Sequence, residues 1–274
     1  MFHVIIVGAD GYAGGSDALA LAGTLVADHG ELVIVDVYPA DRELDPEAQR
    51  SFERLLHDDA RAMLTGLRRE MTVKVRSVPD DAPSDALHRA AVSEQADLIV
   101  VSAGARHHGQ LFAQRDCPVA VAPRGYRHAT AALRTLGVAF DGSADARAAV
   151  ALGARLAGEL GARLRLRTAV EPAGRIDYED AVHRANAELA AVIVALDLRA
   201  AGDVVQAAPE VALQTFSQDV DLLLTGVPGE AKRWRLLTGS PTEWLALHAG
   251  CPVIVVPAPA IDAASLSPPA AAAP

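Results

Sequence analysis

Aromatic residues and cysteine are scarce in this chain of 274 residues. Phe, Trp and Tyr together make up 4% of the sequence, whereas hydrophobic residues make up 51%. The apolar content is therefore mostly Ala, Val and Leu, which is typical of helices packed on Val- and Ile-rich strands. This apolar share also excludes disorder as the overall state. Only two cysteines are present, so a disulfide framework is excluded and a reducing compartment is indicated.

Long apolar runs and an excess of positive charge are also missing. No uninterrupted run of about eighteen apolar residues occurs, so we expect no membrane-spanning segment. The opening residues, MFHVIIVGADG, predict a β-strand rather than a signal peptide. The formal net charge is -10 at pH 7, and an acidic surface repels phosphate backbones. We therefore expect a cytoplasmic protein with neither a membrane nor a nucleic acid as its partner.

The chain reads as two copies of one unit. Asp10 and Asp141 each follow an apolar run near the start of a copy. The segments CPVAVAP and CPVIVVP, which begin at Cys117 and Cys251, close the two copies. Each cysteine precedes a proline at a strand start, and we expect both to be small buried residues. This repetition predicts a first domain of residues 1–124, a second domain of residues 133–258, and a disordered Ala- and Pro-rich tail of residues 259–274.

Short continuous apolar runs alternate with segments of helical spacing, of which Ala144–Leu160 and Tyr178–Leu198 are the clearest. The runs that predict strands are Val4–Val7, Leu32–Val37, Leu98–Val101 and Val119–Val121 in the first unit, and Leu136–Phe140, Leu164–Val170, Val204–Gln206, Leu222–Leu224 and Val253–Val256 in the second. Continuous apolar runs suit strands that are buried on both faces. The alternation predicts parallel strands joined by right-handed crossovers, with ligands bound outside their carboxyl ends.

The segment TGVPGEAKRWRLLTGSPTEW, which begins at Thr225, has the composition of a phosphate-binding loop. A glycine at a strand end lets the backbone approach a ligand, and a helix start presents free N–H groups to an anion. The residues that supply these features are Gly226, Gly229, Gly239, Ser240 as a helix cap, Pro241 at the first helical position, Thr242 with a hydroxyl, and the cations Lys232, Arg233 and Arg235. The same pattern also fits a strand, a loop and a capped helix without a ligand.

Asp141 ends the first strand of the second unit, next to the fourth strand in a doubly wound sheet. Its carboxylate can accept hydrogen bonds from a ribose hydroxyl or contact a metal on the phosphates. The alternative is a turn or helix cap that involves only the chain itself.

These motifs resemble the universal stress protein family in its tandem two-domain form. The resemblance covers Phe2 to about Pro257 and is carried by VAFDGSADA from Val138, by the glycine pattern from Gly226 to Ser240, and by the two CPV strands. It implies an α/β fold of two doubly wound five-stranded parallel sheets, each in the order 3-2-1-4-5 and flanked by helices. It also implies ATP or another adenine nucleotide in the second domain, together with Mg²⁺ or Mn²⁺. By position, Asp141 would contact the ribose or metal region, Gly226, Gly229, Gly239, Ser240 and Thr242 would surround the ribose and phosphates, and Val170 or its neighbour Ala169 would contact adenine.

The first unit departs from this pattern. Its corresponding segment, SAGARHHGQLFAQRDCPV from Ser102, is shorter and lacks the Gly-Ser pair. We therefore expect a truncated connection between its fourth and fifth strands, no helix opened there, and no ATP in the family manner. The family resemblance also implies that closing strands pair edge to edge, here Val119–Val121 with Val253–Val256. Whether two chains form a homodimer is left open.

Three functions follow from these patterns. The first is a stress-response regulatory protein that binds an adenine nucleotide without strong catalysis, since no acid–base pair is evident in the motifs. The second is a slow ATPase or an adenylyl-transfer enzyme, for which Asp141 is the only suggested base. The third is a nucleotide-free interaction scaffold.

Overall fold

A computed structural model describes residues 1–9, 13–42, 45–67, 69–104, 108–114, 116–128, 132–171, 177–227 and 241–258. Strands and helices alternate along the chain, as predicted. The strands are β1 (Phe2–Ala9), β2 (Val26–Tyr38), β3 (Met71–Pro79), β4 (Leu98–Ser102), β5 (Val119–Ala122), β6 (Thr135–Ala139), β7 (Arg163–Val170), β8 (Ala200–Gln206), β9 (Leu222–Gly226) and β10 (Val253–Val256). The helices are α1 (Ala13–Leu25), α2 (Pro46–Leu64), α3 (Pro83–Glu94), α4 (His108–Ala113), α5 (Ala144–Leu160), α6 (Asp177–Ala195), α7 (Pro209–Gln218) and α8 (Pro241–His248), with a 3-10 turn η1 (Tyr126–His128).

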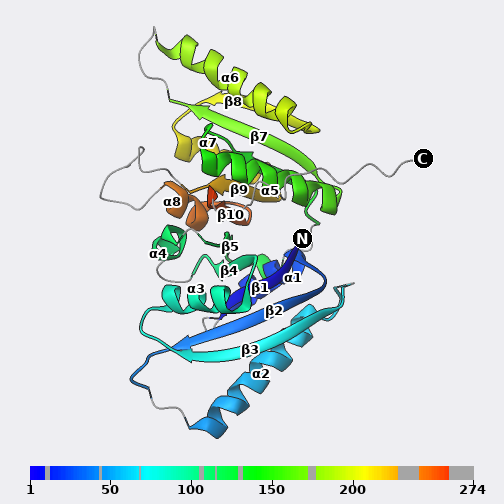
Figure 1. Ribbon diagram of the computed structural model, residues 1–274, viewed down its shortest axis with the longest axis vertical. Coiled ribbons are helices and arrows are strands. Elements are labelled where there is room, and N and C mark those ends of the chain that lie inside the picture. Colours follow the sequence, from blue (N-terminus) through cyan, green and yellow to red (C-terminus); the bar gives the residue numbers. More distant parts are fainter. Residues whose placement is uncertain are drawn as a thin grey trace, which may run out of the picture.

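The strands form a single sheet of ten in the order β3-β2-β1-β4-β5-β10-β9-β6-β7-β8. Figure 1 shows this sheet along the long axis of the molecule, with β8 near one end and β3 near the other. Each half has the predicted internal order 3-2-1-4-5, and its strands pair in parallel. The predicted two separate sheets are instead one, because the closing strands of the two halves join.

The join is an antiparallel pairing of β5 with β10. Val121 lies opposite Val253, and Ala120 lies opposite Ile254. The predicted pairing of the closing strands is therefore confirmed. Both strands are buried along their whole length, so neither presents an open edge to another molecule. Because this one pairing is antiparallel, the carboxyl ends of the strands in the two halves point toward opposite edges of the sheet.

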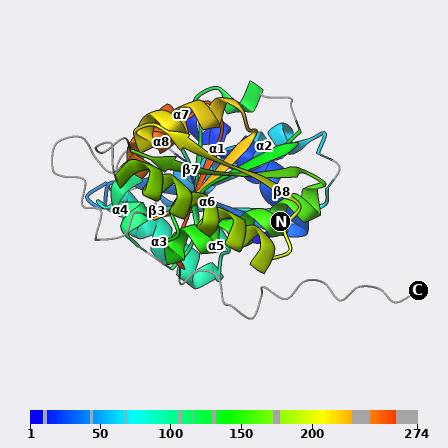
Figure 2. The same cartoon turned by 90° about the horizontal axis from the view of Figure 1, so that it is seen from above.

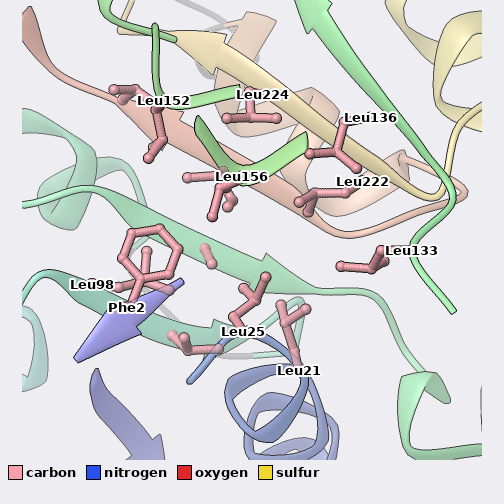
Figure 3. Packing of buried hydrophobic residues seen from close by; sticks show 14 of the residues in the cluster. Phe2, Leu21, Leu25, Leu98, Leu133, Leu136, Leu152, Leu156, Leu222 and Leu224 are labelled. Atoms are coloured by element: carbon pink, nitrogen blue, oxygen red, sulfur yellow. The ribbon is translucent and has the colours of Figure 1, made fainter. Parts of the chain in front are cut away.

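Helices cover both faces of the sheet. One apolar cluster packs α1, α2, α5 and α6 on one face, and a second packs α3, α4, α7 and α8 on the other. Figure 2, viewed from above, shows helices on either side of the strands. The first cluster crosses the junction, where Phe2 and Leu25 of one half gather with Leu152 and Leu156 of the other (Figure 3). Full burial of each such side chain contributes about 1.5–3 kcal/mol, so the halves stabilise one another.

Local sequence signals set the ends of α5, which follows β6 directly. The Ser143 hydroxyl accepts a hydrogen bond from the N–H of Ala146 and caps the first turn. Gly161 ends the helix with a left-handed φ of 64° and donates its N–H to the preceding turn. The predicted bounds of this helix, Ala144–Leu160, are confirmed. The start of α5 is thereby fixed at the carboxyl end of β6.

The repeat extends to a pair of aspartates that precede β4 and β9. Asp221 accepts hydrogen bonds from the N–H groups of Arg134 and Thr135 at 2.9 and 2.8 Å. Asp97 accepts from the N–H groups of His3 and Val4 in the same way. Each carboxylate thus ties the start of the first strand of its half to the start of the fourth.

The first half differs from the prediction at α4 and at β3. We expected the shortened connection after β4 to have lost its helix, but α4 is present there because Leu111 and Phe112 bury in the second apolar cluster. Strand β3 was not among the predicted runs, since its side chains alternate between half-buried and exposed positions.

The predicted tail, 259–274, lies outside the described residues. No helix in the described ranges is long and apolar enough to cross a membrane.

Candidate functional site

The carboxyl ends of β6 and β9 lie side by side in the second half of the chain. Val138 of β6 pairs in parallel with Leu224 of β9. After β6 the chain enters α5 on one face of the sheet, and α8, which follows β9, packs on the opposite face. Adjacent parallel strands whose connections leave toward opposite faces mark the switch in strand order, where open α/β sheets bind their ligands.

The predicted ribose-region carboxylate, Asp141, lies in an exposed turn between β6 and α5. Its Oδ1 accepts a hydrogen bond from the N–H of Ser143 at 3.0 Å. Gly142, between them, has a φ of +79° that favours glycine. This turn accounts for all three residues by local structure, which was the alternative interpretation of Asp141. An ionised carboxylate has about four acceptor positions, so the turn remains compatible with a contact to a ribose hydroxyl.

Gly226 ends β9 where that strand meets the first turn of α5. A Cβ atom at this position would lie 2.7 Å from the backbone N of Ala146 and 2.8 Å from the Cβ of Asp145. No side chain fits there without moving the helix. Gly226 is therefore required for close packing of β9 against α5, whatever else approaches it. This contact holds the turn of Asp141 close to the end of β9.

Val170 is the last residue of β7, and this end of the strand extends past its neighbour. The last pair between β6 and β7 joins Ala139 to Arg167, whereas β7 continues to pair with β8 as far as Val170 and Gln206. Thr168, Ala169 and Val170 consequently border the space beyond the end of β6 where Asp141 lies. The structure thus places the predicted adenine position and the predicted ribose position at one edge of the sheet.

The rest of the predicted phosphate loop is only partly described. Gly229, Gly239 and Ser240 lie outside the described residues, as does the side chain of Thr242. Helix α8 begins at Pro241, so the prediction that a helix opens directly after Ser240 is confirmed. Its amino-terminal turn includes Thr242 and follows the strand that ends at Gly226.

Two carboxylates that sequence reasoning missed border this edge. The Oε2 atom of Glu188, on α6, would lie 2.7 Å from a Cβ at Gly142. Asp145, in the first turn of α5, is 5% exposed and accepts a hydrogen bond from the N–H of Ala258 at 2.5 Å. The position of Glu188 depends on how α6 packs, so no local pattern marks it. Together with Asp141 these groups make the edge acidic, and a bound phosphate would need cations or N–H groups on its other side.

A divalent cation can be held by a cluster of protein ligands or on the phosphates of a nucleotide. Within these ranges no three His, Cys, Asp or Glu side chains gather where they would hold a metal ion. Mg²⁺ is commonly held through one or two carboxylates and the phosphates of a nucleotide rather than by a protein cage. Asp141 fits that mode, because it places an exposed carboxylate at the edge of the switch point.

The two cysteines have the environment that the sequence predicted. Both are buried and unpaired, and burial raises the pKa of the Cys117 and Cys251 thiols to about 12. Neither thiol is therefore a nucleophile near neutral pH, since the thiolate is the reactive form.

The model of the universal stress protein family matches residues 132–257, the half that contains this edge. A universal stress protein from Archaeoglobus fulgidus matches 93% of this chain and 98% of its own, with 15% identity and a TM-score of 0.70. A universal stress protein from Pseudomonas aeruginosa matches 97% and 96%, with 14% identity and a TM-score of 0.63. A universal stress protein in complex with cAMP is 26% identical over 47% of this chain and 99% of its own, with a TM-score of 0.36. No curated protein matches this chain.

Proposed function

We propose that this chain is a stress-response regulatory protein that binds ATP or another adenine nucleotide in its second half, where residues 132–257 match the model of the universal stress protein family. The observation that carries the proposal is the edge where Asp141, Gly226 and the start of α8 follow adjacent parallel strands. The start of a helix offers N–H groups and the positive end of the helix dipole to a phosphate. Lys232, Arg233 and Arg235 lie between β9 and α8 in the sequence and supply the cations that this acidic edge needs.

Different residues of the site contact different parts of the nucleotide. Asp141 accepts a hydrogen bond from a ribose hydroxyl, and the first turn of α8 with Ser240 and Thr242 holds the phosphates. Gly229 and Gly239 let the backbone approach them. A divalent cation, when bound, would neutralise phosphate charge beside Asp141.

The first half lacks room for the same loop. Five residues separate the end of β4 at Ser102 from the start of α4 at His108, whereas fourteen separate Gly226 from Pro241. A polyphosphate-wrapping loop needs the longer connection. The first half therefore acts through its junction with the second half, and one nucleotide is expected in each chain.

A thermal-shift titration with ATP, ADP, AMP and cAMP tests the proposal. A nucleotide at one hundred times its dissociation constant stabilises the folded protein by about 2.7 kcal/mol. Gly239→Val should abolish the shift, because a branched side chain blocks the backbone approach. Gly104→Val, after β4 in the first half, is the matched control and should preserve it, since a Cβ there meets only the Ser102 hydroxyl at 3.7 Å. The absence of any shift with all four nucleotides would favour an interaction scaffold.

The enzymatic alternative is separated from binding by turnover. Protein incubated with ATP and magnesium should release less than one product per chain over an hour if it is a regulatory binder. Sustained turnover that Asp141→Ala removes, with ATP binding retained, would identify a slow ATPase instead.

A further inference from the structure

Thr168 is a buried residue near the carboxyl end of β7, and its hydroxyl group bonds to none of the described residues. Its side chain is 8% exposed, and its Oγ1 atom has no partner among the residues that the structure describes. Burial of an unpaired hydroxyl is unfavourable, and valine would have the same shape and strand preference without that cost. Its presence at this point is the observation that indicates a partner outside the described residues.

The position of Thr168 indicates what that partner is. Along β7, Leu164 and Leu166 face the cluster that includes α5 and α6, whereas Arg167 lies over the ring of Phe216 on the other face. Since side chains alternate along a strand, Thr168 and Val170 share the face of Leu164 and Leu166. Thr168 also lies just beyond the last residue of β7 that pairs with β6, in the stretch that borders the space above Asp141.

The first half provides an internal comparison. Val7 pairs with Ile34 of β2 as Val138 pairs with Leu166 of β7, so Asp36, two residues after Ile34, is the counterpart of Thr168. Asp36 has charged neighbours in its own half, Arg42 and Glu53. In the half that lacks the phosphate loop, the counterpart residue has charged groups of its own half near it, whereas the Thr168 hydroxyl has no partner among the described residues.

We propose that the Thr168 hydroxyl is a binding and specificity residue that hydrogen-bonds to the purine base of the nucleotide. This inference rests on the proposed function. A hydroxyl both donates and accepts, so it pairs with a ring nitrogen or with an amino group. The contact is to the base rather than the sugar because Thr168 shares its strand face with Val170, while the ribose position at Asp141 belongs to the neighbouring strand.

Calorimetric titration of ATP into the wild-type protein, Thr168→Val and Thr168→Ser tests this inference. Thr168→Val should raise the Kd for ATP about tenfold, which corresponds to about 1.4 kcal/mol, and should leave the Tm of the free protein unchanged or higher. Thr168→Ser keeps the hydroxyl and should stay within about threefold of wild type. With 2′-deoxy-ATP the loss caused by Thr168→Val should be as large as with ATP.

Other results of these titrations would refute either the inference or the proposed function. If the wild-type protein binds no adenine nucleotide, the proposed function fails and the inference with it. If the wild-type protein binds ATP and Thr168→Val binds it equally well, the inference alone is refuted. A Tm that falls by several degrees in free Thr168→Val would show that the hydroxyl has a structural partner and would also refute it. Loss of the penalty with 2′-deoxy-ATP would assign the contact to the sugar and overturn the base assignment.

Discussion

Replacing Gly226 by alanine should destabilise the second half by a predictable amount. The new Cβ would lie 2.7 Å from the Ala146 N and the Asp145 carbonyl carbon, and 2.8 Å from the Asp145 Cβ. All three atoms belong to the first turn of α5 and cannot rotate away, so the helix must move by several tenths of an ångström. Overpacking of this kind costs about 1–3 kcal/mol. The shift also moves the Asp141 turn away from β9, so ATP affinity should fall together with stability.

Gly158, on the same helix, is the matched control for that prediction. A Cβ there meets no atom within 4 Å, and alanine within a helix is favoured over glycine by about 0.5–1 kcal/mol. Urea unfolding followed by circular dichroism should therefore place Gly158→Ala at or above the wild-type midpoint and Gly226→Ala clearly below it. If Gly226→Ala unfolds at the wild-type midpoint and binds ATP normally, the close contact between β9 and α5 is wrong.

Three further predictions concern other parts of the chain. Native protein should react with a thiol reagent only slowly at pH 7 and show both cysteines after denaturation, because Cys117 and Cys251 are buried with the pKa of each thiol at about 12; fast labelling of the native protein would contradict this. Burial raises the pKa of Asp36 from its ordinary value of 3.8, so the folded state holds this proton more strongly than the unfolded state does. Ionised Asp36 therefore lowers the stability of the protein as the pH rises from 3.8 through the pKa of Asp36 in the folded state. Asp36→Asn should accordingly raise the Tm more at pH 7 than at pH 3, and an equal change at both would refute the assignment. Asp221→Ala leaves the N–H groups of Arg134 and Thr135 at the start of β6 without their acceptor and should cost about 1–3 kcal/mol in urea unfolding, whereas an unchanged midpoint would show that water replaces the carboxylate.

Sequence reasoning worked where the signal was local. The spacing of apolar residues predicted both ends of α5, and the continuous apolar runs of β5 and β10 indicated buried strands, whereas their pairing was an expectation from the family resemblance. Sequence reasoning missed β3, a strand whose side chains are only partly buried. In β3, Val73 and Val75 alternate with exposed residues, so a search for continuous apolar runs passes over an edge strand.

In the candidate site, too, local features could be predicted from the sequence and tertiary contacts could not. The start of α8 at Pro241 follows from capping residues in the sequence, but the approach of Glu188 to Gly142 depends on how α6 crosses the sheet. The alternation of Leu164, Leu166 and Thr168 along β7 was available in the sequence. That the Thr168 hydroxyl has no partner in the described part of the chain depends on the tertiary structure, which no spacing rule supplies.

Native mass spectrometry of the full chain with saturating ATP and magnesium tests the central claim most directly. The account predicts a complex of one adenine nucleotide per chain, lost in Gly239→Val and retained in Gly104→Val. A chain that carries no nucleotide under these conditions, or one that carries two, would contradict it.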